Sequence, residues 1–187
     1  MQEIKGEVLE NKASVLLKNG TVDRVFGWKK GEFDYDITPA LFTTAEDIEK
    51  EFVWGDFCGA NFSKYLVKET GKSENKVLVF LKPCDTYSFN QLLTEHRFDR
   101  EKVYAVGVPC NGMLGTGKIK SNAEGIAKIT DNGDNVTIET LFDGEITLDR
   151  NELLPDRCLN CKSKKHVAYD ELLGEDGTGL DSHRFVE

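Results

Sequence analysis

Two apolar runs of similar length stand near the middle of the chain, at residues 76–81 and 102–108. Between them, residues 85–97 carry apolar side chains three and four positions apart, a spacing that predicts an amphipathic helix. A strand, a helix and a second strand of these lengths form a βαβ unit, in which the two strands run parallel. The pattern therefore predicts an α/β fold built on a mostly parallel sheet.

The region before these strands is predicted to alternate between helices and strands. In order, the pattern gives a helix over residues 3–18, a strand over 22–28, a second short strand within 29–39, a helix starting after Thr44, and a helix over 57–69. Asp47 stands three positions after Thr44, the spacing of a capping box, so we expect Thr44 to cap its helix.

The region after the second strand changes character, with many glycines and short alternating runs. Asp131-Asn-Gly-Asp134 separates two such runs and signals a hairpin, and a third short strand is expected over 145–148. We expect a small antiparallel piece over residues 118–174 and an irregular tail over 174–187. At this length the 187 residues are expected to form a single domain.

Charge and hydropathy exclude two classes of partner. The net charge is −9, with Lys+Arg 24 against Asp+Glu 33, and a nucleic-acid-binding surface normally shows as an excess of basic residues. No apolar run is long enough to cross a bilayer, and the first residues lack the apolar core of a signal peptide. We therefore expect a cytoplasmic protein that neither binds nucleic acid nor inserts into a membrane.

Two cysteines follow the two central strands directly. Cys84 comes after Lys82-Pro83, and Cys110 comes after Pro109. Parallel strands end at the same edge of a sheet, where open α/β folds bind their ligands. We therefore expect the two sulfurs to be neighbours in space.

A Cys-x-x-Cys pair, Cys158 and Cys161, completes a candidate metal site with Cys84 and Cys110. Two cysteines at this spacing present both sulfurs to one centre, and four thiolates suit a [4Fe–4S] cluster or a zinc ion. The alternatives are inert buried thiols and a redox-active dithiol at the pair. Cys58 stands apart: we expect a buried core thiol, with a fifth metal ligand as the alternative.

The choice between iron–sulfur and zinc depends on where the ligands come from. Structural zinc sites usually take ligands from closely spaced pairs, whereas two of these cysteines arrive singly from strand ends, which favours a cluster. Lys162, Lys164 and Lys165 follow the pair at once, and their charge would offset that of a thiolate-bound cluster. A zinc-stapled interaction module remains the alternative.

A glycine-rich loop follows Cys110 and resembles a phosphate-binding loop. Gly112, Gly115, Gly117 and Lys118 hold matching positions, but Ile119 replaces the Ser or Thr that would hold magnesium, and no helix is predicted after the loop. A nucleotide triphosphatase is therefore disfavoured. The alternative is that this loop contacts a flavin phosphate, such as that of FAD, or a partner. The three histidines, His96, His166 and His183, lack metal-like spacing, and His96 is expected to pack on its helix.

Several motifs taken together resemble the β subunits of deazaflavin (factor 420)-dependent hydrogenases and dehydrogenases, including formate dehydrogenase β subunits. The motifs are Lys82-Pro-Cys-Asp85, the run from Val103 to Gly112, Phe52-Val-Trp54, Asn61 to Leu66, and Arg157-Cys-Leu-Asn-Cys161. They cover most of residues 20–174.

This resemblance implies an iron–sulfur protein of anaerobic metabolism. By it, Cys84, Cys110, Cys158 and Cys161 would hold the cluster, and electrons would pass between partner subunits or ferredoxin-like proteins in a hetero-oligomer. The chain would act as a redox subunit of an oxidoreductase and would not be catalytic alone. Larger relatives add ferredoxin-type repeats or a flavin-binding region, and this sequence has neither.

Overall fold

The computed structural model describes residues 4–33 and 35–178. Its centre is a six-stranded mixed sheet in the order β2-β1-β4-β5-β9, with β3 paired to β1. The strands are β1 (Arg24–Lys30), β2 (Ile37–Phe42), β3 (Phe52–Val53), β4 (Val77–Leu81), β5 (Val103–Gly107) and β9 (Glu171–Leu172). The β1–β4, β4–β5 and β5–β9 pairs are parallel, whereas β2 and β3 pair with β1 in the antiparallel sense. The predicted α/β fold is confirmed.

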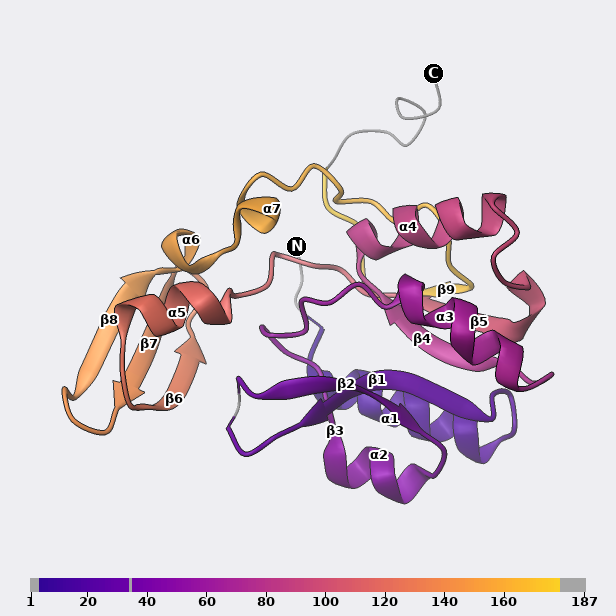
Figure 1. Cartoon of the computed structure of the whole chain (residues 1–187), viewed down its shortest axis with the longest axis horizontal. Coiled ribbons are helices and arrows are strands. Elements are labelled where there is room, and N and C mark those ends of the chain that lie inside the picture. The colour runs from indigo at the N-terminus through magenta and orange to yellow at the C-terminus, as the bar shows by residue number, and fades with distance from the viewer. Residues whose placement is uncertain (1–3, 34, 179–187) are drawn as a thin grey trace.

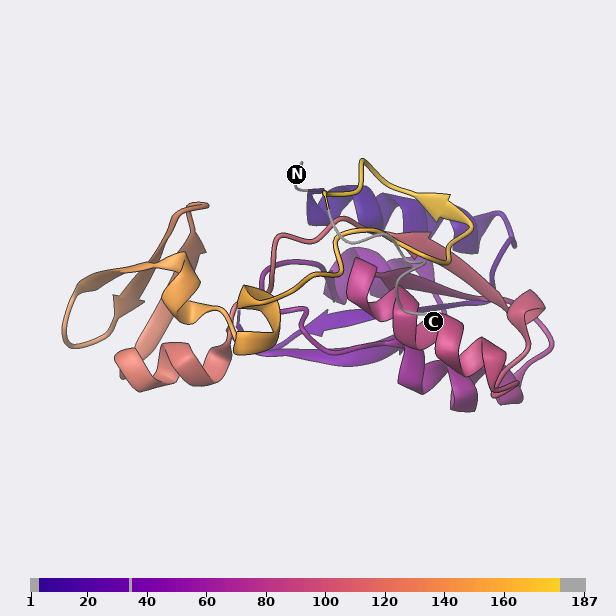
Figure 2. The ribbon, with the colours of Figure 1, turned by 90° about the horizontal axis from the view of Figure 1, so that it is seen from above.

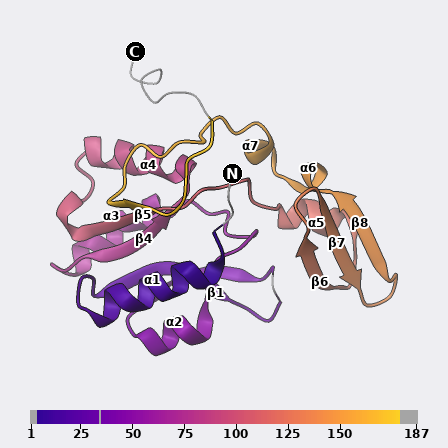
Figure 3. The same cartoon turned by 180° about the vertical axis from the view of Figure 1, so that it is seen from behind.

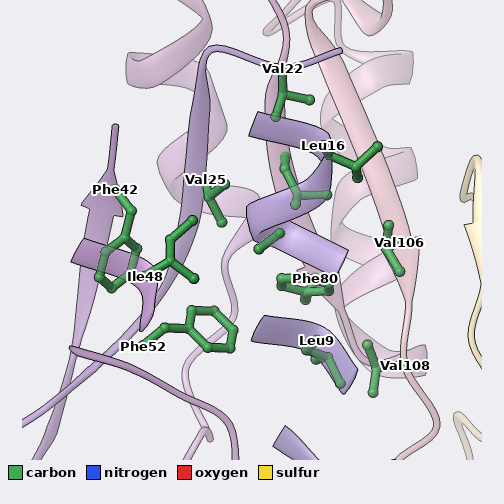
Figure 4. Packing of buried hydrophobic residues seen from close by; sticks show 12 residues of the cluster. Leu9, Leu16, Val22, Val25, Phe42, Ile48, Phe52, Phe80, Val106 and Val108 are labelled. Atoms are coloured by element: carbon green, nitrogen blue, oxygen red, sulfur yellow. The ribbon is translucent and has the colours of Figure 1, made fainter. Parts of the chain in front are cut away.

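Helices cover both faces of this sheet (Figure 2). They are α1 (Gly6–Lys18), α2 (Ala45–Glu51), α3 (Ser63–Glu69) and α4 (Pro83–Thr94), with short 3-10 turns η1 (Thr70–Lys72) and η2 (Arg100–Lys102). Because side chains alternate along a strand, β4 supplies both cores. Phe80 packs with α1 and α2 on one face (Figure 4), and Val79 and Leu81 pack with α3 and α4 on the other.

The predicted βαβ unit is present, with β4 and β5 paired in register from Val77 opposite Val103. Its helix begins two residues earlier than expected and ends at Thr94, with Pro83 at its first turn. His96 therefore lies beyond the helix, exposed and with φ of 52°, so the expectation that it packs on the helix is wrong. The Thr44 cap is confirmed, since its hydroxyl accepts from the Asp47 N–H at 3.1 Å.

The helix expected over residues 57–69 is shorter than predicted, because only Ser63–Glu69 is helical. The apolar residues before it pack in an irregular segment. Phe62 is fully buried and its ring lies against Phe26 and Trp28, with centroid separations of 4.6 and 4.8 Å. Phe62 is the residue directly before α3, so the predicted helix is present only in its second half.

A second, three-stranded antiparallel sheet projects from the end of the first (Figures 1 and 3). It contains β6 (Ile126–Asp131), β7 (Asn135–Thr140) and β8 (Glu145–Asp149), and it confirms the predicted hairpin and third strand. It has its own small core, in which Val136 and Ile138 are fully buried. Two short helices, α6 (Arg150–Leu153) and α7 (Asp156–Leu159), lead from it back to the main sheet.

A helix does follow the glycine-rich loop, contrary to expectation. It is α5 (Thr116–Asn122), and Ile119 on it is buried in the core of the antiparallel sheet. Burial of Ile119 explains why an apolar residue stands there, where a magnesium-binding loop would need a hydroxyl.

The chain after α7 returns along the main sheet and adds β9, a strand that the sequence did not reveal. Asp170 anchors it, because its carboxylate accepts from the Ala105 N–H at 2.7 Å and its own N–H donates to the Ala105 oxygen at 2.8 Å. This return segment, residues 161–178, therefore lies beside the strand that leads to Cys110. Among the described residues, no helix has the length and apolar character needed to cross a bilayer.

Candidate metal centre

Four cysteines from three separate parts of the chain line one small cavity at the carboxyl edge of the sheet. They are Cys84, Cys110, Cys158 and Cys161, and the cavity has a volume of about 100 Å³. Its remaining lining includes Lys82, Arg157 and Lys164. Sulfur atoms are the main potential ligands of this cavity, which is small and mostly apolar.

The central strands place the first two cysteines. Cys84 is the second residue of α4, directly after β4, and it lies exposed at the rim. Cys110 follows β5, and the pairing continues past the strand ends because the Val108 N–H donates to the Leu81 oxygen at 2.8 Å. The parallel register thus brings both residues to the same edge of the sheet.

The second pair of cysteines sits on a tight turn at α7. The N–H of Cys158 donates to the Pro155 oxygen at 2.8 Å, and the N–H of Cys161 donates to the Cys158 oxygen at 3.2 Å. This turn packs on the loop after Cys110. A Cβ on Gly112 would lie 3.7 Å from that of Cys158, and Gly112 has φ of 104°, a conformation that favours glycine.

The thiols of the first pair have raised pKa values. Although Cys84 as a residue is exposed, the atoms around its sulfur remove water from it, and this desolvation, followed by the charge of Asp85, raises the pKa of Cys84 to about 12 against the effect of Lys82. Burial also raises the pKa of Cys110, against the Gly112 N–H, which donates to its sulfur at 3.4 Å, and against the charge of Lys82. A bound metal ion would act against these shifts, because it stabilises the thiolate form of a coordinating sulfur.

A buried ion pair adjoins the cavity. The Lys82 Nζ lies 2.7 Å from Asp85 Oδ2, and the two side chains are only 3% and 2% exposed. The Asp85 carboxylate also accepts from the Lys82 main-chain N–H at 3.1 Å, which completes a capping box at the start of α4. Sequence reasoning missed this pair, because a lysine before a proline gives no sign of burial.

The donor set fits a thiolate-bound metal, although no ligand geometry is formed. In residues 4–33 and 35–178, no group of three or more His, Cys, Asp or Glu side chains is arranged closely enough to hold a metal ion. The fit depends on chemistry and placement, since four cysteines line one cavity together with cationic residues. Ligation by these cysteines stays a prediction.

Cys58 lies apart from this cavity. It is fully buried in the core around Phe62, where its sulfur accepts from the Gly55 N–H at 3.3 Å. Burial raises its pKa to about 12. Its surroundings are those of a packed core thiol.

The glycines of the glycine-rich loop line two different cavities. Gly112 lines the cysteine cavity, whereas Gly115 and Gly117 line a neighbouring cavity of about 700 Å³ that also touches Cys84. The Lys118 ammonium lies 3.4 Å from Asp156. A flavin phosphate on this loop stays a prediction.

The fold and the cysteine cavity together define an α/β protein with a candidate thiolate centre at the edge of its sheet.

No protein-family model matches the sequence. Among curated proteins, the chain is similar to an F420-dependent formate dehydrogenase subunit beta of Methanocaldococcus jannaschii, with 28% identity over 99 residues, which are 53% of this chain and 26% of that protein. A formate dehydrogenase 1 subunit beta of Methanococcus maripaludis, also F420-dependent, is 31% identical over 99 residues, 53% of this chain and 25% of that protein.

A solved structure shares the fold. A chain in the F420-reducing [NiFe] hydrogenase complex from Methanosarcina barkeri superposes with a TM-score of 0.62 and 18% identity, over 86% of this chain and 60% of that one. The resemblance to β subunits of F420-dependent enzymes is therefore confirmed. The matched region spans only about a quarter of the curated relatives.

Proposed function

We propose that this protein is an electron-transfer subunit that holds one [4Fe–4S] cluster on Cys84, Cys110, Cys158 and Cys161. The observation that carries the proposal is their convergence on one cavity from two strand ends and a Cys-x-x-Cys turn. When bound, such a cluster supplies one-electron transfer at a potential that its protein surroundings set. The relatives named above support a redox role, since they are subunits of F420-dependent enzymes.

The chain's own residues would position and tune the centre. The β4 and β5 ends hold two ligands rigidly, and the α7 turn brings the other pair. Cys84 is exposed at the rim, so the surface of a partner redox protein can approach the site there. We infer that the protein works in a hetero-oligomer with other redox subunits or with ferredoxin-like proteins.

Anaerobic purification followed by iron, acid-labile sulfide and zinc analysis tests this function. We expect four irons and four sulfides per chain, with broad visible absorbance that reductant bleaches. Cys84→Ala and Cys158→Ala should each lower iron content severalfold, while Cys58→Ala should retain it. Stoichiometric zinc without sulfide would instead establish the zinc-stapled module.

A flavin is a second candidate, favoured by a cleft on the other side of Cys110. The cleft has a volume of about 620 Å³, within the range of cofactor sites, and its lining includes Lys5, Trp54, Asp56 and Arg150. Of the glycine-rich loop's predicted phosphate contacts, only Gly112 borders this cleft. A yellow chromophore released on denaturation would support FAD or a related flavin, and the absence of released flavin after growth with riboflavin would argue against it.

A further inference from the structure

The ion pair of Lys82 and Asp85 places a buried positive charge against the cysteine cavity. Lys82 lines the cavity, and besides Asp85 its ammonium donates to the Ala60 oxygen at 3.1 Å and lies 5.8 Å from the ring centroid of Trp54. Lysine is almost never buried to this degree unless it is paired, and even a buried pair costs desolvation energy that the attraction between its charges often fails to repay. A contribution to stability therefore does not explain why this pair is buried here.

Anchoring the turn between β4 and α4 does not require the ammonium. The capping bond is made by the Asp85 carboxylate and the main-chain N–H of Lys82, so a residue with any side chain at position 82 could make it. What the lysine side chain adds is a charge inside the protein. The carboxylate of Asp85, 2.7 Å from the Lys82 Nζ, stabilises the protonated amine, so the side chain is cationic.

The two members of the pair act differently on the cysteines. Lys82 lines the same cavity as Cys84 and Cys110, so the positive charge of its ammonium favours negative charge on their sulfurs. The Asp85 carboxylate, whose Oδ1 lies 3.9 Å from the Cys84 sulfur, disfavours negative charge there. The pair is thus a dipole whose two ends have opposite effects on negative charge in the cavity.

We propose that Lys82 provides the counter-charge of the cysteine centre, and that its ammonium raises the reduction potential and strengthens metal binding there. A reduced thiolate-bound cluster carries one more negative charge than the oxidised form, so a fixed cation nearby favours reduction. The cation likewise stabilises any divalent metal held by four thiolates, because such a site carries net negative charge. The effect on potential rests on the proposed cluster, whereas the effect on metal affinity does not.

Lys82→Met and Asp85→Asn test the proposal with opposite expected signs. In an anaerobic redox titration followed by electron paramagnetic resonance, Lys82→Met should shift the equilibrium toward the oxidised form at least tenfold, about 59 mV for one electron. Asp85→Asn should shift it the other way. Lys12→Met is the control, because Lys12 pairs with Glu171 and does not line the cysteine cavity. Shifts of equal sign in Lys82→Met and Asp85→Asn would overturn the counter-charge. A redox equilibrium constant of Lys82→Met within twofold of that of the Lys12→Met control would overturn it as well.

A second measurement separates this inference from the proposed function. Reduced, metal-free protein is titrated with Co²⁺, and the thiolate-to-cobalt absorbance gives the affinity. Lys82→Met should bind at least tenfold more weakly and Asp85→Asn more tightly than the Lys12→Met control, whether the native metal is iron or zinc. If the native protein lacks iron and sulfide, the cluster fails while this comparison still decides the role of Lys82. If circular dichroism shows that Lys82→Met does not fold, the cobalt affinity of Asp85→Asn relative to the control decides. Weaker cobalt binding by Asp85→Asn refutes the proposal.

Discussion

Arg150 donates a hydrogen bond to the main-chain oxygen of Gly112 at 3.0 Å, and so ties the antiparallel sheet to the loop after Cys110. The same guanidinium donates to the Asn111 oxygen at 3.3 Å and pairs with Asp131 on β6. The side chains of Arg150 and Asp131 are only 12% and 10% exposed. The antiparallel sheet is thus attached to the main body next to the cysteine cavity.

Arg150→Ala should loosen this attachment and lower the stability of the protein by about 2 kcal/mol, because it removes charged hydrogen bonds and leaves Asp131 largely buried without that partner. Urea unfolding measures the loss, and hydrogen exchange should show that it falls mainly on β6 to β8. Lys128→Ala is the matched control, since the Lys128–Glu139 pair is exposed and its loss should cost less than about 1 kcal/mol. Equal losses in the two variants would show that Arg150 has no special role.

Cys58 should resist alkylation in the folded, metal-free protein. The thiolate is the reactive form, so a pKa of about 12 leaves almost no reactive sulfur at neutral pH, and the residue is also fully buried. Its labelling rate should rise as the pH approaches that value. Iodoacetamide labelling with mass spectrometry checks this, and all five cysteines should react in denaturant. Labelling of Cys58 as fast as that of Cys161 in folded protein would contradict the observed packing.

The fold was predictable where burial leaves a regular pattern. The strand from Val77 to Leu81 is buried on both faces, and continuous apolar sequence is the signature of such a strand. From that strand and its partner, the parallel geometry led directly to the proximity of Cys84 and Cys110. The two continuous apolar runs and the helix-like spacing between them were sufficient to predict that Cys84 and Cys110 lie at the same edge of the sheet.

The rest depended on contacts that leave no periodic trace. The two-residue strand β9 is held by Asp170 and by pairing to β5, neither of which needs an apolar run. The burial of Lys82 depends on two partners, Asp85 and Ala60. Asp85 is close to Lys82 in the sequence, but Ala60 is far from it, so no local pattern joins the three residues. Such features become visible only when the packing partners are known.

His166 should hold the return segment, residues 161–178, against the main sheet. Its side chain is fully buried, Nε2 donates to the Leu81 oxygen at 3.0 Å, and Nδ1 contacts the Asp176 carboxylate. His166→Ala removes both contacts and leaves a cavity, so we expect a loss of about 2–3 kcal/mol. Limited proteolysis should cleave this segment faster than in wild type. Lys162→Ala, at an exposed position, is the control, and unchanged cleavage in His166→Ala would contradict the anchoring role.

Gly112→Ala should disturb the cysteine cavity more than its backbone conformation alone explains. Gly112 and Gly133 both have positive φ, at 104° and 94°, so alanine should cost roughly 1–3 kcal/mol in strain at either position. At Gly133 nothing lies within 4 Å of the added Cβ, whereas at Gly112 it would lie 3.2 Å from Leu154 Cδ2 and 3.7 Å from Cys158 Cβ.

The two glycine variants therefore separate strain from contact. Both should lower the midpoint of thermal unfolding, but only Gly112→Ala should also weaken Co²⁺ binding to the reduced protein, because its added methyl group presses on Leu154, two residues before the α7 turn that carries Cys158. The cobalt titration with Gly133→Ala as the reference measures this difference. Equal cobalt affinities in the two variants would mean that the cavity adjusts to the methyl group, and that close packing of Gly112 on Leu154 does not position the second pair of cysteines.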